Sequence, residues 1–128
     1  MDYSIIEDIV KKRVKNMHEI NEKEIDKIIQ CSIKILEFCK INSIEFDETA
    51  GIVFVSHITT FYERAKKKEY IKVDCELFAE LGEELYKMGE KIIEIMNEYF
   101  NCIVPKDEIL LISSHLGAMK ERLNKEEC

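Results

Sequence analysis

The stretch FAELGEELYKMGEKIIEIMNEY, residues 78–99, repeats apolar side chains at alternating intervals of three and four residues. This spacing forms a heptad seam of three repeats, so we expect a helix capped by Asp74 that runs to about Tyr99. The seam comprises Phe78, Leu81, Leu85, Met88, Ile92, Ile95 and Tyr99. Gly82 and Gly89 flank it, and because glycine costs roughly 1 kcal/mol in a helix interior, the pair predicts a closely packed neighbouring helix.

Four further segments have the apolar periodicity of amphipathic helices. We expect helices over residues 3–17, 21–40, 47–68 and 105–123, with residues 124–128 as a frayed tail. Asn21 and Glu24 have the spacing of a capping box, and Asp47 or Thr49 is expected to cap the third helix. With only four glycines and one proline, the chain is predicted to be an all-α, five-helix bundle, one domain over residues 1–128.

The composition excludes several classes of protein. The net charge of −7 makes the 128-residue chain a poor ligand for nucleic-acid phosphates, so we expect no direct nucleic-acid binding. No apolar run approaches the roughly 18 residues of a membrane span, and the first residues lack the apolar core of a signal peptide. Five cysteines without a CxxC pair indicate a reduced, cytoplasmic protein whose thiols pack as small core residues.

Two of the three histidines lie inside predicted helices, in FVSHITTFYER (residues 54–64) and ISSHLGAMK (residues 112–120). Taken alone, such a position favours a partly buried histidine satisfied by one hydrogen bond. Phosphorylation and metal binding are the alternatives, although the chain has no HxxxH, HExxH or paired Cys/His spacing. It also has no nucleophile motif and no glycine-rich phosphate loop. We therefore expect no enzyme, no metal and no cofactor. We expect His18, between two helices, to be a surface or capping residue.

The two histidine segments resemble the motifs of the PRD family, the regulation domains of the sugar phosphotransferase system. These domains occur in bacterial transcriptional antiterminators and activators of sugar operons. HITTFYER matches the first motif, a histidine in an apolar helix followed by aromatic residues and an arginine, with His57 and Arg64 in those places. PKDEILLISSHL matches the second from Pro105 to Leu116, and the separation of 58 residues between the two histidines also fits.

The resemblance implies that His115 and His57 accept a phosphoryl group from HPr or from the IIB component of a sugar permease. It implies Arg64 and Arg122 as candidate partners for the phosphate, and Asp107 and Glu108 as acidic residues that support the second motif. A homodimer or an unknown downstream regulator would then transmit the signal to transcription. Family members often carry an acidic residue where this chain has Ser56, so the alternative is a helical dimerisation or interaction module that has lost phosphotransfer.

Overall fold

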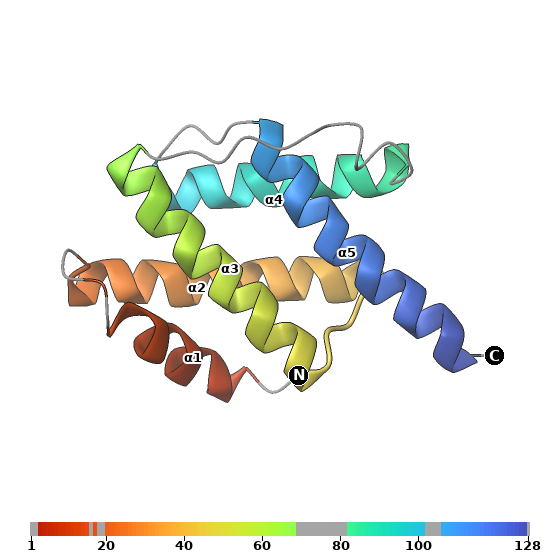
Figure 1. Ribbon diagram of the computed structural model, residues 1–128, viewed down its shortest axis with the longest axis horizontal. Coiled ribbons are helices and arrows are strands. Elements are labelled where there is room, and N and C mark those ends of the chain that lie inside the picture. The colour runs from red at the N-terminus through yellow and green to blue at the C-terminus, as the bar shows by residue number, and fades with distance from the viewer. Residues whose placement is uncertain (1–2, 16, 18–19, 69–81, 102–105, 128) are drawn as a thin grey trace.

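Five α-helices and no strands make up the residues that the computed structural model describes, which are 3–15, 17, 20–68, 82–101 and 106–127 (Figure 1). The helices are α1 (Ser4–Val14), α2 (Glu22–Ile41), α3 (Glu48–Lys67), α4 (Glu83–Phe100) and α5 (Lys106–Glu127). The prediction of an all-α, five-helix bundle is confirmed. None of the helices within these ranges is both long enough and apolar enough to span a bilayer.

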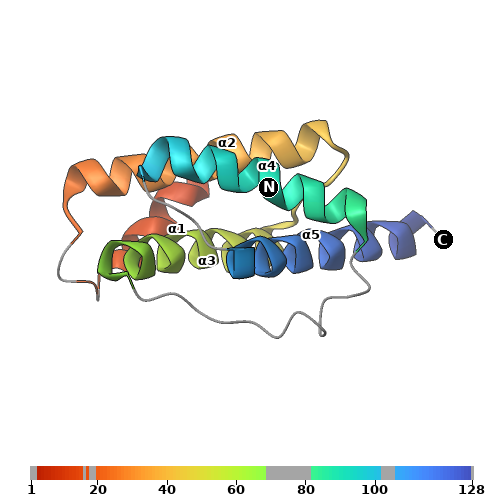
Figure 2. The same ribbon diagram turned by 90° about the horizontal axis from the view of Figure 1, so that it is seen from above.

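The helices lie in two layers (Figure 2). One layer holds α2 and α4, which pack against each other, and α3 and α5 cross this layer on one side. The α1 helix packs against both α2 and α3, whereas α5 packs mainly against α4. The chain runs in opposite directions along α3 and α5, so the end of α3 lies near the start of α5 (Figure 1). This antiparallel arrangement decides which residues of the two helices can meet.

The starts of α2 and α3 are fixed by the caps that the sequence predicts. Asn21 Oδ1 accepts a hydrogen bond from the Glu24 backbone N–H at 2.9 Å, and Glu24 Oε1 accepts one from the Asn21 N–H at 3.2 Å, which confirms the capping box. Asp47, and not Thr49, caps α3 by accepting from the Ala50 N–H at 2.8 Å. Because each cap satisfies N–H groups that the first turn leaves unpaired, it determines where the helix begins.

Glu24 also ties α2 to α3. Its Oε2 accepts hydrogen bonds from the Tyr62 hydroxyl and from Lys66 Nζ, the latter at 2.8 Å. Phe100 of α4 packs against the Tyr62 ring, with 4.8 Å between the ring centroids. The C-terminal half of α3, which carries Arg64, is therefore held by contacts from two neighbouring helices.

The prediction of one continuous helix from Asp74 to Tyr99 is wrong at Gly82. This residue has a φ of +82° and precedes the first residue of α4, a conformation that glycine adopts because it has no Cβ. A Cβ at Gly82 would meet nothing within 4 Å, so this glycine provides no close packing. Asp74 and the start of the seam, Phe78 and Leu81, lie outside the described residues.

Gly89, in contrast, allows the close approach that the sequence predicts. A Cβ there would lie 2.3 Å from Ser113 Oγ and 3.1 Å from the Ile109 carbonyl oxygen, both on α5. Ser113 is fully buried and donates its hydroxyl hydrogen bond to the Leu85 carbonyl of α4 at 3.2 Å. The α4–α5 contact at Gly89 therefore determines the register of α5, which carries His115 two residues after Ser113.

Two helix ends differ from the prediction. The α1 helix ends at Val14 and not at Met17, whose N–H instead donates to the Val14 carbonyl in a turn at 2.8 Å. The α5 helix continues to Glu127, four residues beyond the predicted end at residue 123. The segment contains no glycine or proline that would end a helix.

The core confirms two of the cysteines as packing residues. The thiols of Cys31 and Cys39 in α2 are buried, and burial raises the pKa of Cys39 to about 12. A thiol with so high a pKa is protonated at neutral pH and behaves as a small apolar side chain. The remaining cysteines, Cys75, Cys102 and Cys128, lie outside the described residues.

Candidate functional site

His57 of α3 and His115 of α5 lie together, with 5.0 Å between the centroids of their rings. Residues seven apart lie on the same face of an α-helix, because two turns bring the side chain back to nearly the same direction. Arg64 follows His57 by seven residues, and Glu108 precedes His115 by seven. In antiparallel helices these two pairs face each other, and the four side chains form one cluster that we call the histidine site.

Aromatic rings form the inner wall of the histidine site. Phe54, which is fully buried one turn before His57, meets the His115 ring edge to face with 5.5 Å between centroids. Phe46 stacks on the ring of Phe54, with 4.6 Å between the ring centroids. His115 is therefore half-buried against apolar surface and keeps only part of its contact with water.

Burial and the neighbouring His57 together lower the pKa of His115 to about 4. Burial lowers it because a charged imidazolium loses hydration, and His57 lowers it further because a second positive charge would be repelled. His115 is consequently a neutral imidazole at pH 7, with a lone pair on one of its two nitrogens.

Glu108 joins the two helices from a position with no exposed surface. Its Oε1 accepts a hydrogen bond from Arg64 Nη2 at 2.6 Å, and its Oε2 lies 3.5 Å from His57 Nε2. The side chains of His57 and Arg64 are each only 16% exposed. The sequence motif assigned Glu108 a place in the first turn of the helix, and the structure shows that it is also a buried counter-ion for α3.

The carboxylate of Glu108 stays ionised despite its burial. Burial raises the pKa of this group, but the adjacent His57 and Arg64 lower it by more, so that the net shift is downward. An ionised, fully buried carboxylate requires partners of opposite charge, because an unpaired buried charge is strongly unfavourable. Arg64 supplies the permanent positive charge of the histidine site.

Three buried polar atoms of the histidine site have unused hydrogen-bonding capacity. They are His57 Nε2, Glu108 Oε2 and Arg64 Nε, for which the described residues provide no hydrogen-bond partner. The 3.5 Å between the first two atoms exceeds the usual length of an N–H···O hydrogen bond. The ring nitrogen of His57 and the carboxylate oxygen of Glu108 therefore face each other at slightly more than hydrogen-bond distance, and Arg64 Nε–H has no partner among the described residues.

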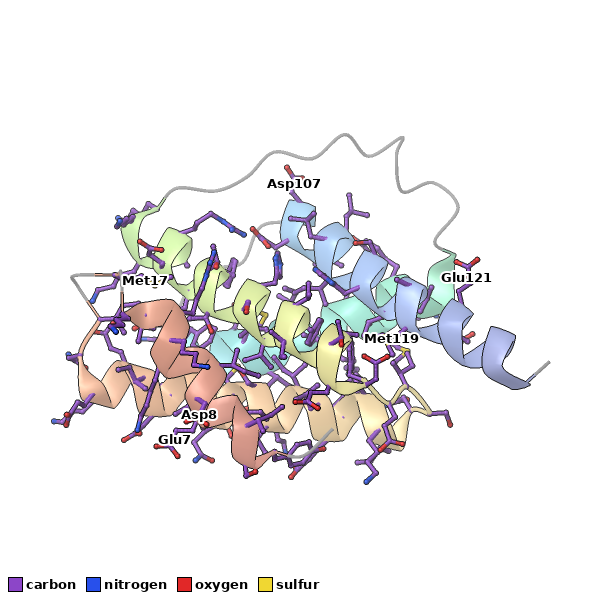
Figure 3. The ribbon with its side chains drawn as sticks, turned by 60° about the horizontal axis from the view of Figure 1, so that its bottom comes forward. Glu7, Asp8, Met17, Asp107, Met119 and Glu121 are labelled. Atoms are coloured by element: carbon purple, nitrogen blue, oxygen red, sulfur yellow. The ribbon has the colours of Figure 1, made fainter. Side chains whose placement is uncertain are left out.

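Of the six residues that the motifs predict, the structure brings four together: His57, Arg64, Glu108 and His115. Asp107 lies at the N-terminal end of α5 and points away from the bundle (Figure 3). The side chain of Arg122 lies outside the described residues, as does His18. The motifs did not indicate that Phe46 and Phe54 belong to the site. The apolar pattern of a helix predicts which residues are buried, but it does not predict which residues they contact.

Among the residues that the structure describes, no group of three or more His, Cys, Asp or Glu side chains is arranged to hold a metal ion. The two histidines and Glu108 are arranged instead as a buried carboxylate beside paired imidazoles.

Comparisons with known proteins identify a family and several relatives. The family model of the PRD domain matches residues 32–119, a range that includes His57, Arg64, Glu108 and His115. The protein named Protein GlcT from the Staphylococcus aureus strains JH9, Newman and JH1 is 22% identical over 113 residues. This alignment covers 86% of the chain and 39% of each relative, so the chain spans about two fifths of their length. No solved structure is significantly similar to the chain.

The low pKa of His115 predicts a specific dependence of stability on pH. Between an ordinary histidine pKa of about 6.5 and the folded value of about 4, the unfolded chain binds the proton and the folded chain does not. Folding stability should therefore fall by about 1–3 kcal/mol as the pH is lowered through this window, after allowance for the partial exposure of the ring. Urea unfolding at several pH values should show a smaller fall for His115→Gln. An equal fall in parent and variant would contradict the prediction.

Proposed function

Because the chain belongs to the PRD domain family, we propose that it is a regulatory domain of the sugar phosphotransferase system and not an enzyme. It accepts a phosphoryl group on histidine, with HPr or the IIB component of a sugar permease as the donor. It then acts on transcription through a homodimer or through a partner regulator. This function places the protein in the cytoplasm, where such donors carry their phosphoryl groups.

The observation that carries the proposal is the pairing of His57 and His115 across α3 and α5, with His115 held neutral. A phosphoryl acceptor needs an uncharged nitrogen with a lone pair, and burial against Phe54 supplies this condition for His115. The neighbouring ring of His57 also disfavours protonation of His115, which helps to keep the acceptor nitrogen uncharged.

Arg64 and Glu108 give phosphorylation a route to a change in structure. The phosphoryl group brings close to two negative charges and several strong acceptors, which compete with the Glu108 carboxylate for the Arg64 guanidinium. A contact between α3 and α5 would thereby be weakened or rearranged. Couplings of this kind are typically about 1–3 kcal/mol, less than the roughly 5.5 kcal/mol of a complete two-state switch. The domain would therefore modulate an equilibrium between assemblies. Arg122 stays a second candidate for pairing with the phosphate.

A second candidate function is a helical interaction module that has lost phosphotransfer. Two observations favour it: the buried negative charge of Glu108 beside His57 opposes an incoming dianion, and Arg64 is already engaged by that carboxylate. Ser56 in place of the acidic residue frequent in the family points the same way.

Phosphotransfer distinguishes the two functions. Incubated with phosphoenolpyruvate, enzyme I and HPr, with or without a IIB domain, the protein should take up phosphate that is labile to acid and stable to base. Acid lability is expected because the P–N bond breaks once the nitrogen is protonated. His115→Ala is the variant in which we chiefly expect the label to be lost, because the motif around His115 is the more complete of the two. His57→Ala is the next candidate.

The matched control is His18→Ala, which removes a histidine outside both motifs and should label like the parent. Circular dichroism should show that each variant is folded, because loss of a half-buried ring can cost on the order of 1–3 kcal/mol. A parent that stays unlabelled with every donor would favour the interaction module. Loss of label only in His18→Ala would contradict the assignment of the sites.

The surface of α3 supports the proposal of a homodimer. Ile52 is 42% exposed and Val53 is 54% exposed, little more than one turn before His57. Ile52 also lines a shallow groove with Ile5 and Ile9 of α1. Exposed apolar groups next to a proposed regulatory site are typical of a contact surface, and most homo-oligomers are symmetric dimers. A symmetric dimer through this face would bring the phosphorylation site close to the subunit interface.

Charge introduced on this face should weaken the dimer. Light scattering at high micromolar concentration should give a dimer for the parent, and Ile52→Asp with Val53→Asp should shift the population toward monomer by tenfold or more, as a buried interfacial charge costs at least about 1.4 kcal/mol. Ile41→Asp is the matched control, because Ile41 is 82% exposed at the end of α2. A monomeric parent would argue against this interface. So would an Ile41→Asp variant that weakens the dimer as much as Ile52→Asp with Val53→Asp does.

A further inference from the structure

The two nitrogens of His57 have different surroundings. Nε2 is buried and lies 3.5 Å from Glu108 Oε2, with no hydrogen-bond partner among the described residues. The side chain as a whole is 16% exposed, so the part of His57 that water reaches is not Nε2. A neutral imidazole carries a proton on one nitrogen and a lone pair on the other, and the surroundings decide which.

Glu108 favours the proton on Nε2. A lone pair on Nε2 would face the negatively charged Oε2 and be repelled, whereas an N–H group in that place would be attracted to it. Both atoms are shielded from water, so this preference is screened less than at the surface. Arg64 holds the other carboxylate oxygen at 2.6 Å, which fixes the orientation of the carboxylate toward His57.

We propose that Glu108 is a positioning residue that holds His57 as the Nε2–H tautomer, so that Nδ1 is the nitrogen that accepts the phosphoryl group. The tautomer follows from the geometry of the histidine site alone, and the phosphoryl step rests on the proposed function. The same geometry makes Nε2 of His57 unsuitable as the acceptor for two reasons. It is buried away from an incoming phosphoryl donor, and in this tautomer it has no free lone pair.

The atoms of the transfer balance as follows. The lone pair of His57 Nδ1 forms the new N–P bond while the bond between phosphorus and the donor side chain breaks. The electron pair of the broken bond returns to the donor atom, which leaves as the unphosphorylated donor side chain. The proton on Nε2 stays in place, and the positive charge that the ring acquires is offset by the Glu108 carboxylate.

The tautomer can be measured without any phosphoryl donor. In protein labelled with ¹⁵N at histidine, long-range ¹H–¹⁵N correlation spectra distinguish a protonated from an unprotonated ring nitrogen. At about pH 8 the His57 signals, identified by their loss in His57→Gln, should report a single tautomer with the proton on Nε2. The urea-unfolded chain gives the reference mixture. A proton on Nδ1 of His57, or the same mixture as in the unfolded chain, would overturn the proposal.

The role of Glu108 is tested by Glu108→Gln, with Asp107→Asn as the matched control that removes a charge from the adjacent residue. The negative charge of Glu108 attracts an N–H group at Nε2 across 3.5 Å in a site shielded from water, so the ratio of Nε2–H to Nδ1–H should fall about tenfold in Glu108→Gln. The ratio should be unchanged in Asp107→Asn. An unchanged ratio in Glu108→Gln would overturn the positioning role. If that variant does not fold, the tautomer of His57 measured in the parent protein still tests the proposal.

Phosphorylation then separates this proposal from the proposed function. If His57 takes up phosphate, the ³¹P–¹⁵N coupling should lie at Nδ1, and coupling at Nε2 would overturn the proposal. If no donor labels the chain, the proposed phosphotransfer fails, while the tautomer measurement still stands as a test of Glu108.

Discussion

The histidine site depends on the carboxylate of Glu108. This group is fully buried, ionised and shared between Arg64 and His57, so it joins α5 to α3 at one point. Removing one member of such a cluster leaves a charge without a partner, which typically costs about 3–5 kcal/mol. His57 and Arg64 are seven residues apart on α3, as are Glu108 and His115 on α5. Because the two helices are antiparallel, Arg64 meets Glu108 at one end of the cluster and His57 meets His115 at the other.

Two other constraints hold the parts of the site in register. Gly89 lets α5 approach α4 closely at Ser113, and the link from Glu24 to Tyr62 and Lys66 holds the end of α3 against α2. These contacts place the two imidazoles 5.0 Å apart against Phe54, where burial keeps His115 neutral. The chemistry proposed for the site thus depends on packing far from the histidines themselves.

Much of this arrangement could be predicted from the sequence, because helices and caps are local. Apolar periodicity located all five helices, and the capping box at Asn21 and Glu24 is present as expected. The break at Gly82 could not be predicted, since glycine is tolerated within helices and only its positive φ shows the difference. The family motifs selected His57, Arg64, Glu108 and His115, but the burial of Glu108 and the stacking of Phe46 on Phe54 arise from contacts between distant segments, which no local pattern records.

The coupling between Arg64 and Glu108 tests the central claim most directly. A double-mutant cycle with Arg64→Met and Glu108→Gln, followed by urea unfolding, measures how much the free energy of unfolding depends on the pair and not on each residue alone. The buried pair should give a coupling of at least about 1.5 kcal/mol, whereas the exposed pair of Glu83 and Lys87 should give about 0.3–0.5 kcal/mol. Equal couplings for the two pairs would mean that Glu108 does not join α3 to α5.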